Sequence, residues 1–154
     1  MKPGGTVGGG SRRQPANGPV VKHTVPSRPR ILVVEDQEDV RRMLATALEL
    51  EGYRVAEAAN ALEGLDHLGR SHFDLVLTDY AMPGGTGTWM LEEADRLGRM
   101  NGAAALIVTA HPGVRELRDV GVIQKPLDLD FFLDRVRSLL PTDPSSATTR
   151  PRSR

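Results

Sequence analysis

Several polar side chains stand at the ends of apolar runs, where the edge of a sheet could hold them for chemistry. They are Glu35 and Asp36 after "RILVV", Asp79 after "FDLVLT", Thr109 in "AAALIVTA" and Lys125 after "VGVIQ". If these runs are parallel strands of one sheet, their carboxyl ends meet at the edge where ligands bind in open α/β sheets. Three acids, one hydroxyl and one ammonium would then converge from four strands.

Such a cluster carries more negative than positive charge. Carboxylates ~4 Å apart repel one another by a few kcal/mol at an effective dielectric constant of about 20. A hard divalent cation removes this repulsion, and ligands that are all oxygen favour Mg²⁺ or Mn²⁺ over zinc. We predict Asp36 and Asp79 as side-chain ligands. The backbone carbonyl of Ala81 and, through water, Glu35 would complete the protein's share of the site.

A metal ion beside a free carboxylate, an ammonium and a hydroxyl is suited to phosphoryl transfer. Asp79 would attack a phosphoryl group as the nucleophile and become an acyl phosphate. Lys125 would neutralise charge in the transition state, and the hydroxyl of Thr109 would donate a hydrogen bond to a phosphoryl oxygen. The residues therefore predict a phosphoacceptor that assists its own phosphorylation and dephosphorylation, rather than a conventional enzyme.

The elements that must position these groups alternate along the chain. β-branched or alternating runs predict strands over 30–36, 53–59, 73–79, 103–110 and 120–124. Apolar spacing of three and four residues predicts helices around 40–48, 62–68 and 89–97, and another from Asp128 to Leu140. Gly52 should end the first helix, and Asn60 with Glu63 should cap the second. Five βα units predict an α/β fold with a parallel, doubly wound sheet.

Composition and charge predict one cytosolic-type domain between two tails. The chain has 154 residues, 39% hydrophobic residues and no cysteine, which allows a sizeable core and excludes disulfides and thiolate metal sites. We predict residues 1–29 as a disordered basic tail, residues 30–140 as the domain and residues 141–154 as a second disordered tail. Residues 31–140 carry a net charge of −8, whereas both tails are basic.

The tails suggest solvated linkers more than a binding function. Neither contains an aromatic residue for base stacking, so we do not expect a nucleic-acid partner. The chain has no run that resembles the core of a signal peptide and no stretch long enough to span a membrane.

On these residues, the stretch from 31 to 140 resembles the receiver domain of two-component response regulators. The motifs are the acidic pair of "ILVVEDQEDVRRML", the aspartate of "DLVLTDYAMPGG", the threonine of "LIVTAHPG" and the lysine of "VIQKPLD". Asp79 lies 43 residues after Asp36, and Thr109 lies 30 after Asp79, which also fits. The resemblance implies a flavodoxin-like, five-stranded sheet of order 2-1-3-4-5. It also implies Mg²⁺ dependence and phosphorylation of Asp79 by a histidine kinase or a phosphotransfer protein.

Two features depart from the receiver pattern. Only fifteen residues lie between Thr109 and Lys125, fewer than these domains usually have. The crossover from Ala110 to Val120 is near the lower limit for joining parallel strands, so we expect a shortened fourth helix. Val122 stands where these domains commonly have an aromatic residue that moves on phosphorylation. The output surface should therefore differ from the usual one.

We expect a stand-alone receiver that changes partner binding or relays its phosphoryl group, because neither tail could form an output domain. A phosphorylation-independent adaptor with the same fold is the main alternative. A phosphatase of the haloacid dehalogenase type would need a second Asp two residues after the nucleophile, where Ala81 stands. The stretch "GGTGTW" lacks the third glycine of a dinucleotide-binding loop.

The histidines show no spacing typical of metal ligands. His67 and His72 therefore receive no role in the predicted site. His111 follows Thr109 by two residues, a position that the resemblance places beside the approach to the phosphoryl group. Ala81 lies across the same approach, and its small apolar side chain cannot position water.

Overall fold

The computed structural model describes residues 3–5, 27–114 and 120–141. Within them, five parallel strands form one sheet of order β2-β1-β3-β4-β5. The strands are β1 (Arg30–Val34), β2 (Arg54–Ala58), β3 (Leu75–Thr78), β4 (Ala104–Thr109) and β5 (Gly121–Gln124). The predicted α/β class, the parallel pairing and the strand order are confirmed.

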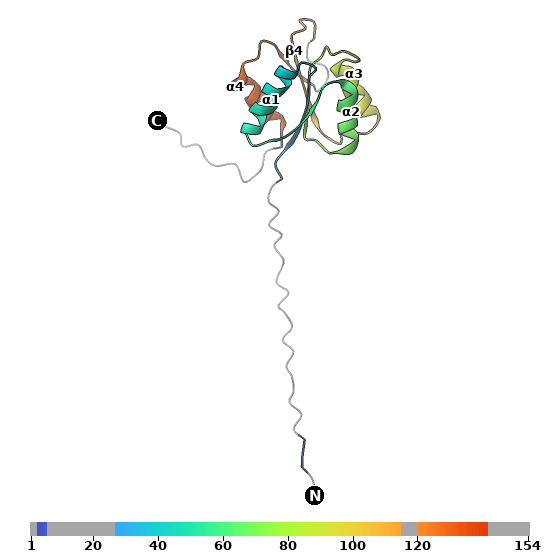
Figure 1. Cartoon of the computed structure of the whole chain (residues 1–154), viewed down its shortest axis with the longest axis vertical. Coiled ribbons are helices and arrows are strands. Elements are labelled where there is room, and N and C mark those ends of the chain that lie inside the picture. Colours follow the sequence, from blue (N-terminus) through green and yellow to red (C-terminus); the bar gives the residue numbers. More distant parts are fainter. Residues whose placement is uncertain (1–2, 6–26, 115–119, 142–154) are drawn as a thin grey trace, which may run out of the picture.

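Four helices in the described part of the chain cover the two faces of the sheet. α1 (Glu38–Leu50) and α4 (Leu129–Leu139) lie on one face, and α2 (Ala61–Arg70) and α3 (Gly87–Arg96) lie on the other (Figure 1). The predicted shortened helix between β4 and β5 falls mostly on residues 115–119, outside the described residues. The tails predicted over 1–29 and 141–154 likewise lie mostly outside them.

The core consists of two layers of apolar side chains, one on each face of the sheet. Ile31 and Val33 face α1 and α4, whereas Leu32 and Val34 face α2 and α3, as the two-residue period of a strand requires. All four are fully buried. Burying a side chain of this size stabilises the fold by about 1.5–3 kcal/mol. Packing on both faces therefore fixes the position of β1 in the sheet. Glu35 and Asp36, which follow β1, are positioned by it.

Local signals in the sequence set the helix ends. The side chain of Asn60 accepts a hydrogen bond from the backbone N–H of Glu63 at 2.9 Å, and the carboxylate of Glu63 accepts one from the N–H of Ala59 at 2.8 Å. Asp128 caps α4 in the same way. Each such cap contributes about 1 kcal/mol. Gly52, with φ of +92°, follows the end of α1 in the left-handed conformation that glycine favours.

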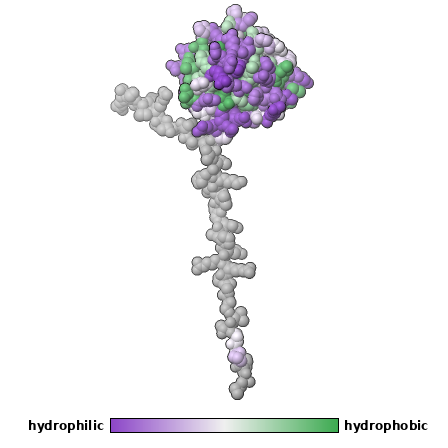
Figure 2. Space-filling view, viewed as in Figure 1, coloured by the Kyte–Doolittle hydropathy of each residue, from purple (hydrophilic) through white to green (hydrophobic). Residues whose placement is uncertain are grey.

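Several apolar residues of the predicted helices lie toward solvent instead of the sheet, among them Met43 of α1 at 49% exposure. Leu62 in the first turn of α2 is 66% exposed, Trp89 is 40% exposed, and Leu97, just after α3, is 42% exposed. The face shown in Figure 2 is mostly hydrophilic, with smaller hydrophobic patches. None of the helices in the described residues combines the length and apolar content needed to cross a membrane.

Candidate functional site

Asp79 stands at the carboxyl edge of the sheet, one residue beyond β3. Its backbone N–H donates to the carbonyl of Val34 at 3.0 Å, which extends the β1–β3 ladder. One carboxylate oxygen, Oδ1, accepts a hydrogen bond from the backbone N–H of Tyr80 at 2.7 Å. The other, Oδ2, lies 3.5 Å from Nζ of Lys125, and the side chain is only 12% exposed. The carboxylate is therefore held by the backbone on one side and faces an ammonium on the other.

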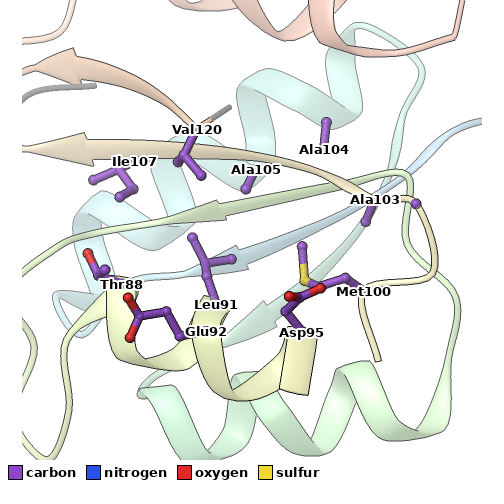
Figure 3. A pocket seen from close by; sticks show the side chains of 11 residues that line it. Thr88, Leu91, Glu92, Asp95, Met100, Ala103, Ala104, Ala105, Ile107 and Val120 are labelled. Atoms are coloured by element: carbon purple, nitrogen blue, oxygen red, sulfur yellow. The ribbon is translucent and has the colours of Figure 1, made fainter. Parts of the chain in front are cut away.

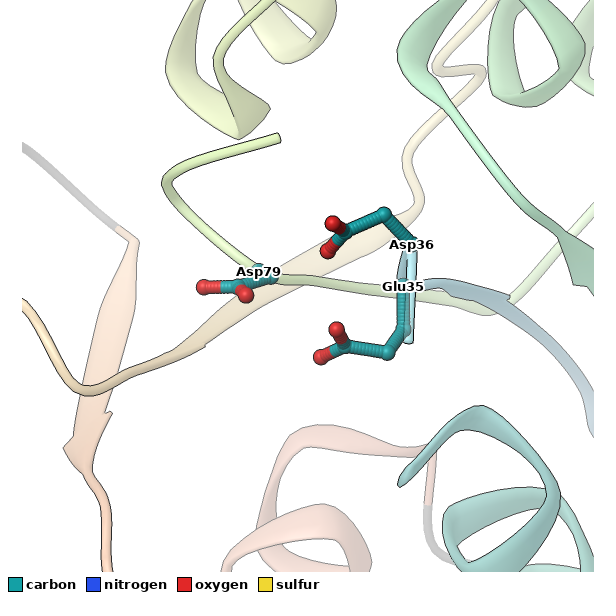
Figure 4. A group of neighbouring side chains, drawn as sticks. All are labelled: Glu35, Asp36 and Asp79. Atoms are coloured by element: carbon teal, nitrogen blue, oxygen red, sulfur yellow. The ribbon is translucent and has the colours of Figure 1, made fainter. Parts of the chain in front are cut away.

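Two further acids approach Asp79 from the end of β1. Carboxylate oxygens of Glu35, Asp36 and Asp79 lie within 4.8 Å of one another. Figure 4 shows the three side chains reaching into one space from two strand ends. At that separation each pair of charges repels by about 3.5 kcal/mol at an effective dielectric constant near 20. This set of oxygen donors fits a hard divalent cation such as Mg²⁺.

Lys125 bridges two of these acids. Its Nζ lies 3.1 Å from Oε2 of Glu35 and 3.5 Å from Oδ2 of Asp79. The backbone N–H of Lys125 donates to the carbonyl of Thr109 at 2.8 Å, which ties the residue to the end of β4, and a cis peptide bond to Pro126 follows it. One ammonium cannot balance three carboxylates, so the cluster keeps an excess of negative charge that a cation would offset.

Glu35 is the most deeply buried member of the cluster, at 2% exposure. Burial raises the pKa of its carboxyl group, although a hydrogen bond from the N–H of Gln37 and the ammonium of Lys125 act in the opposite direction, and the charge of Asp79 adds to the rise. Its other oxygen, Oε1, accepts the N–H of Gln37 at 3.2 Å. Both of its oxygens therefore have donors within the protein, and its supporting role toward a metal ion through water stays a prediction.

Arg41 is a neighbour of the site that the sequence patterns did not identify. Its guanidinium donates to the backbone carbonyl of Glu35 at 2.9 Å and lies 3.4 Å from the carboxylate of Glu57 on β2. The side chain is 15% exposed. Its position six residues after Glu35, in the first turns of α1, is the only sequence signal for this contact. Arg41 thus fixes the backbone from which the acidic pair projects.

Thr109 lies at the end of β4 with 1% exposure. Its Oγ1 accepts a hydrogen bond from the backbone N–H of His111 at 3.0 Å. The ring of His111 contacts that of Tyr80, with 5.4 Å between the ring centres. The loop after β4 therefore touches the residue that follows Asp79. The hydroxyl proton of Thr109 is left able to donate elsewhere.

The loop after Asp79 contains one glycine whose lack of a side chain the site requires. A Cβ at Gly87 would lie 2.1 Å from the backbone oxygen of Asp79, far inside any allowed contact. The N–H of Gly87 donates to the carbonyl of Tyr80 at 2.8 Å. The sequence shows a glycine-rich stretch after Asp79, but it does not indicate that Gly87 is the glycine that packs against Asp79. Ala81, predicted as a backbone ligand, lies exposed in the same loop.

A parallel sheet of order 2-1-3-4-5, with clustered acids, a threonine and a lysine at its carboxyl edge, defines the receiver class of signalling domains. Residues 31–137 match the response regulator receiver domain family, and the chain belongs to this family. The family resemblance predicted from the sequence is confirmed.

Relatives of similar size support the same assignment. Sporulation initiation phosphotransferase F of Bacillus subtilis is 32% identical over 73% of this chain and 94% of its own length. The response regulator receiver protein CpdR of Brucella abortus is 32% identical over 72% of this chain and 96% of its own length. Among solved structures, the response regulator TrrA from Thermotoga maritima, in complex with Mg²⁺ and BeF, is 31% identical with a TM-score of 0.65. That match covers 73% of this chain and 99% of TrrA.

Proposed function

We propose that the chain is a stand-alone receiver that accepts a phosphoryl group on Asp79 from a histidine kinase or a phosphotransfer protein. The observation that carries the proposal is the position of the Asp79 carboxylate. It is 88% buried, bound to a backbone N–H at 2.7 Å, and lies within 3.5 Å of Lys125. In the reaction, an oxygen of Asp79 forms a bond to phosphorus while the P–N bond of the partner's phosphohistidine breaks. The leaving imidazole takes up a proton.

The residues around Asp79 each contribute to this transfer. Lys125, 3.5 Å from Asp79, would attract the phosphoryl oxygens, and the hydroxyl of Thr109 would donate a hydrogen bond to one of them. Asp36 and Asp79 would hold Mg²⁺, with the carbonyl of Ala81 and with Glu35 in support. When bound, Mg²⁺ offsets negative charge on the acids and on the incoming phosphoryl group. The excess negative charge of the acid cluster supports this assignment.

Phosphorylation would be read out through the loop after β4. If the hydroxyl of Thr109 moves to a phosphoryl oxygen, the N–H of His111 loses its 3.0 Å hydrogen bond to Oγ1. The loop must then find a new arrangement, and the contact of His111 with Tyr80 changes with it. The phosphoryl group can shift the loop only by as much as it favours one state over the other. A downstream protein that recognises the rearranged loop would complete the switch.

The proposal is tested by incubating the full chain with acetyl phosphate and measuring intact mass. With Mg²⁺ we expect a gain of one phosphoryl group that hydroxylamine removes, because acyl phosphates react with it. The gain should be lost in EDTA and in Asp79→Asn. Asp66→Asn is the matched control, since Asp66 pairs with exposed Arg70 on α2, and it should behave as wild type.

No mass gain in the wild type would favour the phosphorylation-independent adaptor. A gain that persists in Asp79→Asn would move the acceptor to another residue. The physiological donor would then be identified by the rate at which each of a panel of histidine kinases labels the chain.

A further inference from the structure

The backbone that carries Glu35 and Asp36 is supported from α1. This helix lies on the face of the sheet opposite to a hollow beside α3 and β4, and the described residues that line the hollow include neither acid (Figure 3). Figure 4 shows the side chains of Glu35 and Asp36 leaving the end of β1 in different directions, with both carboxylates turned toward Asp79. The backbone at the end of β1 therefore determines where both carboxylates lie.

The backbone carbonyl of Glu35 lies just beyond the last hydrogen bond between β1 and β2. In that bond the N–H of Glu35 donates to the carbonyl of Ala58 at 3.1 Å. If the parallel ladder continued, the N–H of Asn60 would donate to the carbonyl of Glu35. Instead the chain leaves the sheet, and Asn60 caps α2. Because Glu35 is buried, its carbonyl needs a donor from another element.

Arg41 supplies this donor and is itself held by β2. Its Nη1 donates to the carbonyl of Glu35 at 2.9 Å, and its Nε lies 3.4 Å from the carboxylate of Glu57. Two nitrogens of one planar guanidinium thus serve two acceptors at once, which a lysine ammonium cannot do with the same geometry. The side chain of Arg41 is 15% exposed, so water competes little for these contacts.

The carbonyl that Arg41 holds belongs to the peptide unit that leads into Asp36. A peptide unit is planar, so the direction of this oxygen fixes the position of the Asp36 Cα relative to Glu35. Among the described residues, none donates a hydrogen bond to the carboxylate of Asp36. An oxygen of that carboxylate nevertheless lies within 4.8 Å of oxygens of Glu35 and Asp79, which repel it. The backbone therefore keeps Asp36 in the cluster.

We propose that Arg41 is a positioning residue for the metal site, and that it acts by holding the peptide unit between Glu35 and Asp36. This role rests on the proposed function, because it concerns binding of the divalent cation at that site. Arg41 takes no part in phosphoryl transfer itself. Groups that orient a metal ligand typically change metal affinity by about 10–100-fold.

The charge of Arg41 and its positioning role predict opposite effects on metal affinity. A guanidinium beside the site repels a divalent cation, so on charge alone the loss of Arg41 would strengthen metal binding. Loss of the positioning contact would weaken metal binding, because the peptide unit could rotate and repulsion would displace the carboxylate of Asp36. The direction of the change therefore separates the two roles.

The test measures the dissociation constant of Mn²⁺ from the full chain through the electron paramagnetic resonance signal of the free ion. Arg41→Gln should weaken binding by about tenfold or more. Arg41→Lys keeps the charge without the planar fork and should weaken binding by about threefold or more. The matched control is Arg42→Gln, which removes the same charge from an exposed pair with Glu38 and should change binding by less than about twofold.

A second measurement needs no metal. In EDTA, the heteronuclear NOE of the Asp36 and Gln37 amides should fall in Arg41→Gln and stay unchanged in Arg42→Gln, because the released peptide unit gains freedom of motion. If Arg41→Gln does not fold, Arg41→Lys carries both measurements.

A destabilised control separates positioning from a general loss of stability. Leu68 is buried in the core layer of α2 and α3, on the other face of the sheet from α1. Leu68→Ala should lower the urea midpoint but leave the Mn²⁺ affinity of the folded protein unchanged.

Three results would overturn the role of Arg41 while leaving the metal site in place. The first is Mn²⁺ binding by Arg41→Gln that is as tight as in the wild type, or tighter. The second is an equal loss of affinity in Leu68→Ala, and the third is an unchanged NOE at Asp36 and Gln37. A wild type that takes up no Mn²⁺ would contradict the metal site of the proposed function, and the role of Arg41 would fall with it.

Discussion

Asp79→Asn should stabilise the metal-free protein, although it removes a charged partner of Lys125. The change deletes two carboxylate repulsions, each about 3.5 kcal/mol at the upper separation of 4.8 Å, and one attraction of about 5 kcal/mol at 3.5 Å. The relief exceeds the loss by about 2 kcal/mol. The asparagine amide keeps an acceptor for the N–H of Tyr80. At about 2.1 cal/mol/K of unfolding entropy per residue over residues 30–140, a gain of this size corresponds to a rise of about 9 °C in the midpoint of thermal unfolding.

The assay is thermal and urea unfolding at neutral pH in EDTA, followed by far-ultraviolet circular dichroism. Asp66→Asn, at an exposed ion pair, should change the unfolding free energy by less than about 1 kcal/mol. Mg²⁺ should narrow the difference in unfolding free energy between Asp79→Asn and the wild type. At ten times its dissociation constant it stabilises the wild type by about 1.4 kcal/mol, whereas Asp79→Asn lacks one of the ligands. An Asp79→Asn protein no more stable than the wild type in EDTA would refute the reasoning from charge repulsion.

Three further predictions concern single positions. Because burial raises the pKa of Glu35 above 4.5, the folded state retains a proton that the unfolded state releases. The free energy of unfolding should therefore fall as pH rises from about 4.5 through the folded-state pKa of Glu35. In Glu35→Gln, the urea midpoint should depend less on pH over that range. An unchanged pH dependence would contradict this prediction. Gly87→Ala should lower the free energy of unfolding by about 1–3 kcal/mol and slow phosphorylation by acetyl phosphate, because the added Cβ would clash with the backbone oxygen of Asp79. Normal phosphorylation together with normal stability would contradict this prediction. Thr88→Val should raise the free energy of unfolding in urea by about 1 kcal/mol, because the buried hydroxyl of Thr88 has no hydrogen-bond partner among the described residues. A less stable variant would indicate that the hydroxyl has one.

The location of the candidate site could be predicted from the sequence because it depends on strand ends alone. In a parallel sheet every carboxyl end lies at the same edge, so Asp36, Asp79, Thr109 and Lys125 meet there whatever the details of packing. Asn60 could be predicted as a cap because its partner lies three residues away. The roles of these residues in metal binding and phosphoryl transfer stay predictions.

Features that depend on tertiary packing could not be predicted. The sequence does not show which member of the acidic pair turns inward, and the structure buries Glu35 against Lys125. The contact of Arg41 with the carbonyl of Glu35 depends on how α1 is rotated about its axis. Such features arise from the docking of elements that local patterns describe only singly.

The most direct test of the metal site is a titration of the full chain with Mn²⁺, followed by amide NMR. Paramagnetic broadening reports distance from the bound ion. If the acids of β1 and β3 share a divalent cation, broadening should begin at residues 35–37 and 79–81, extend to Thr109 and Lys125, and be reversed by Mg²⁺. Broadening centred away from residues 35–37 and 79–81, or none at millimolar metal, would contradict the proposed site.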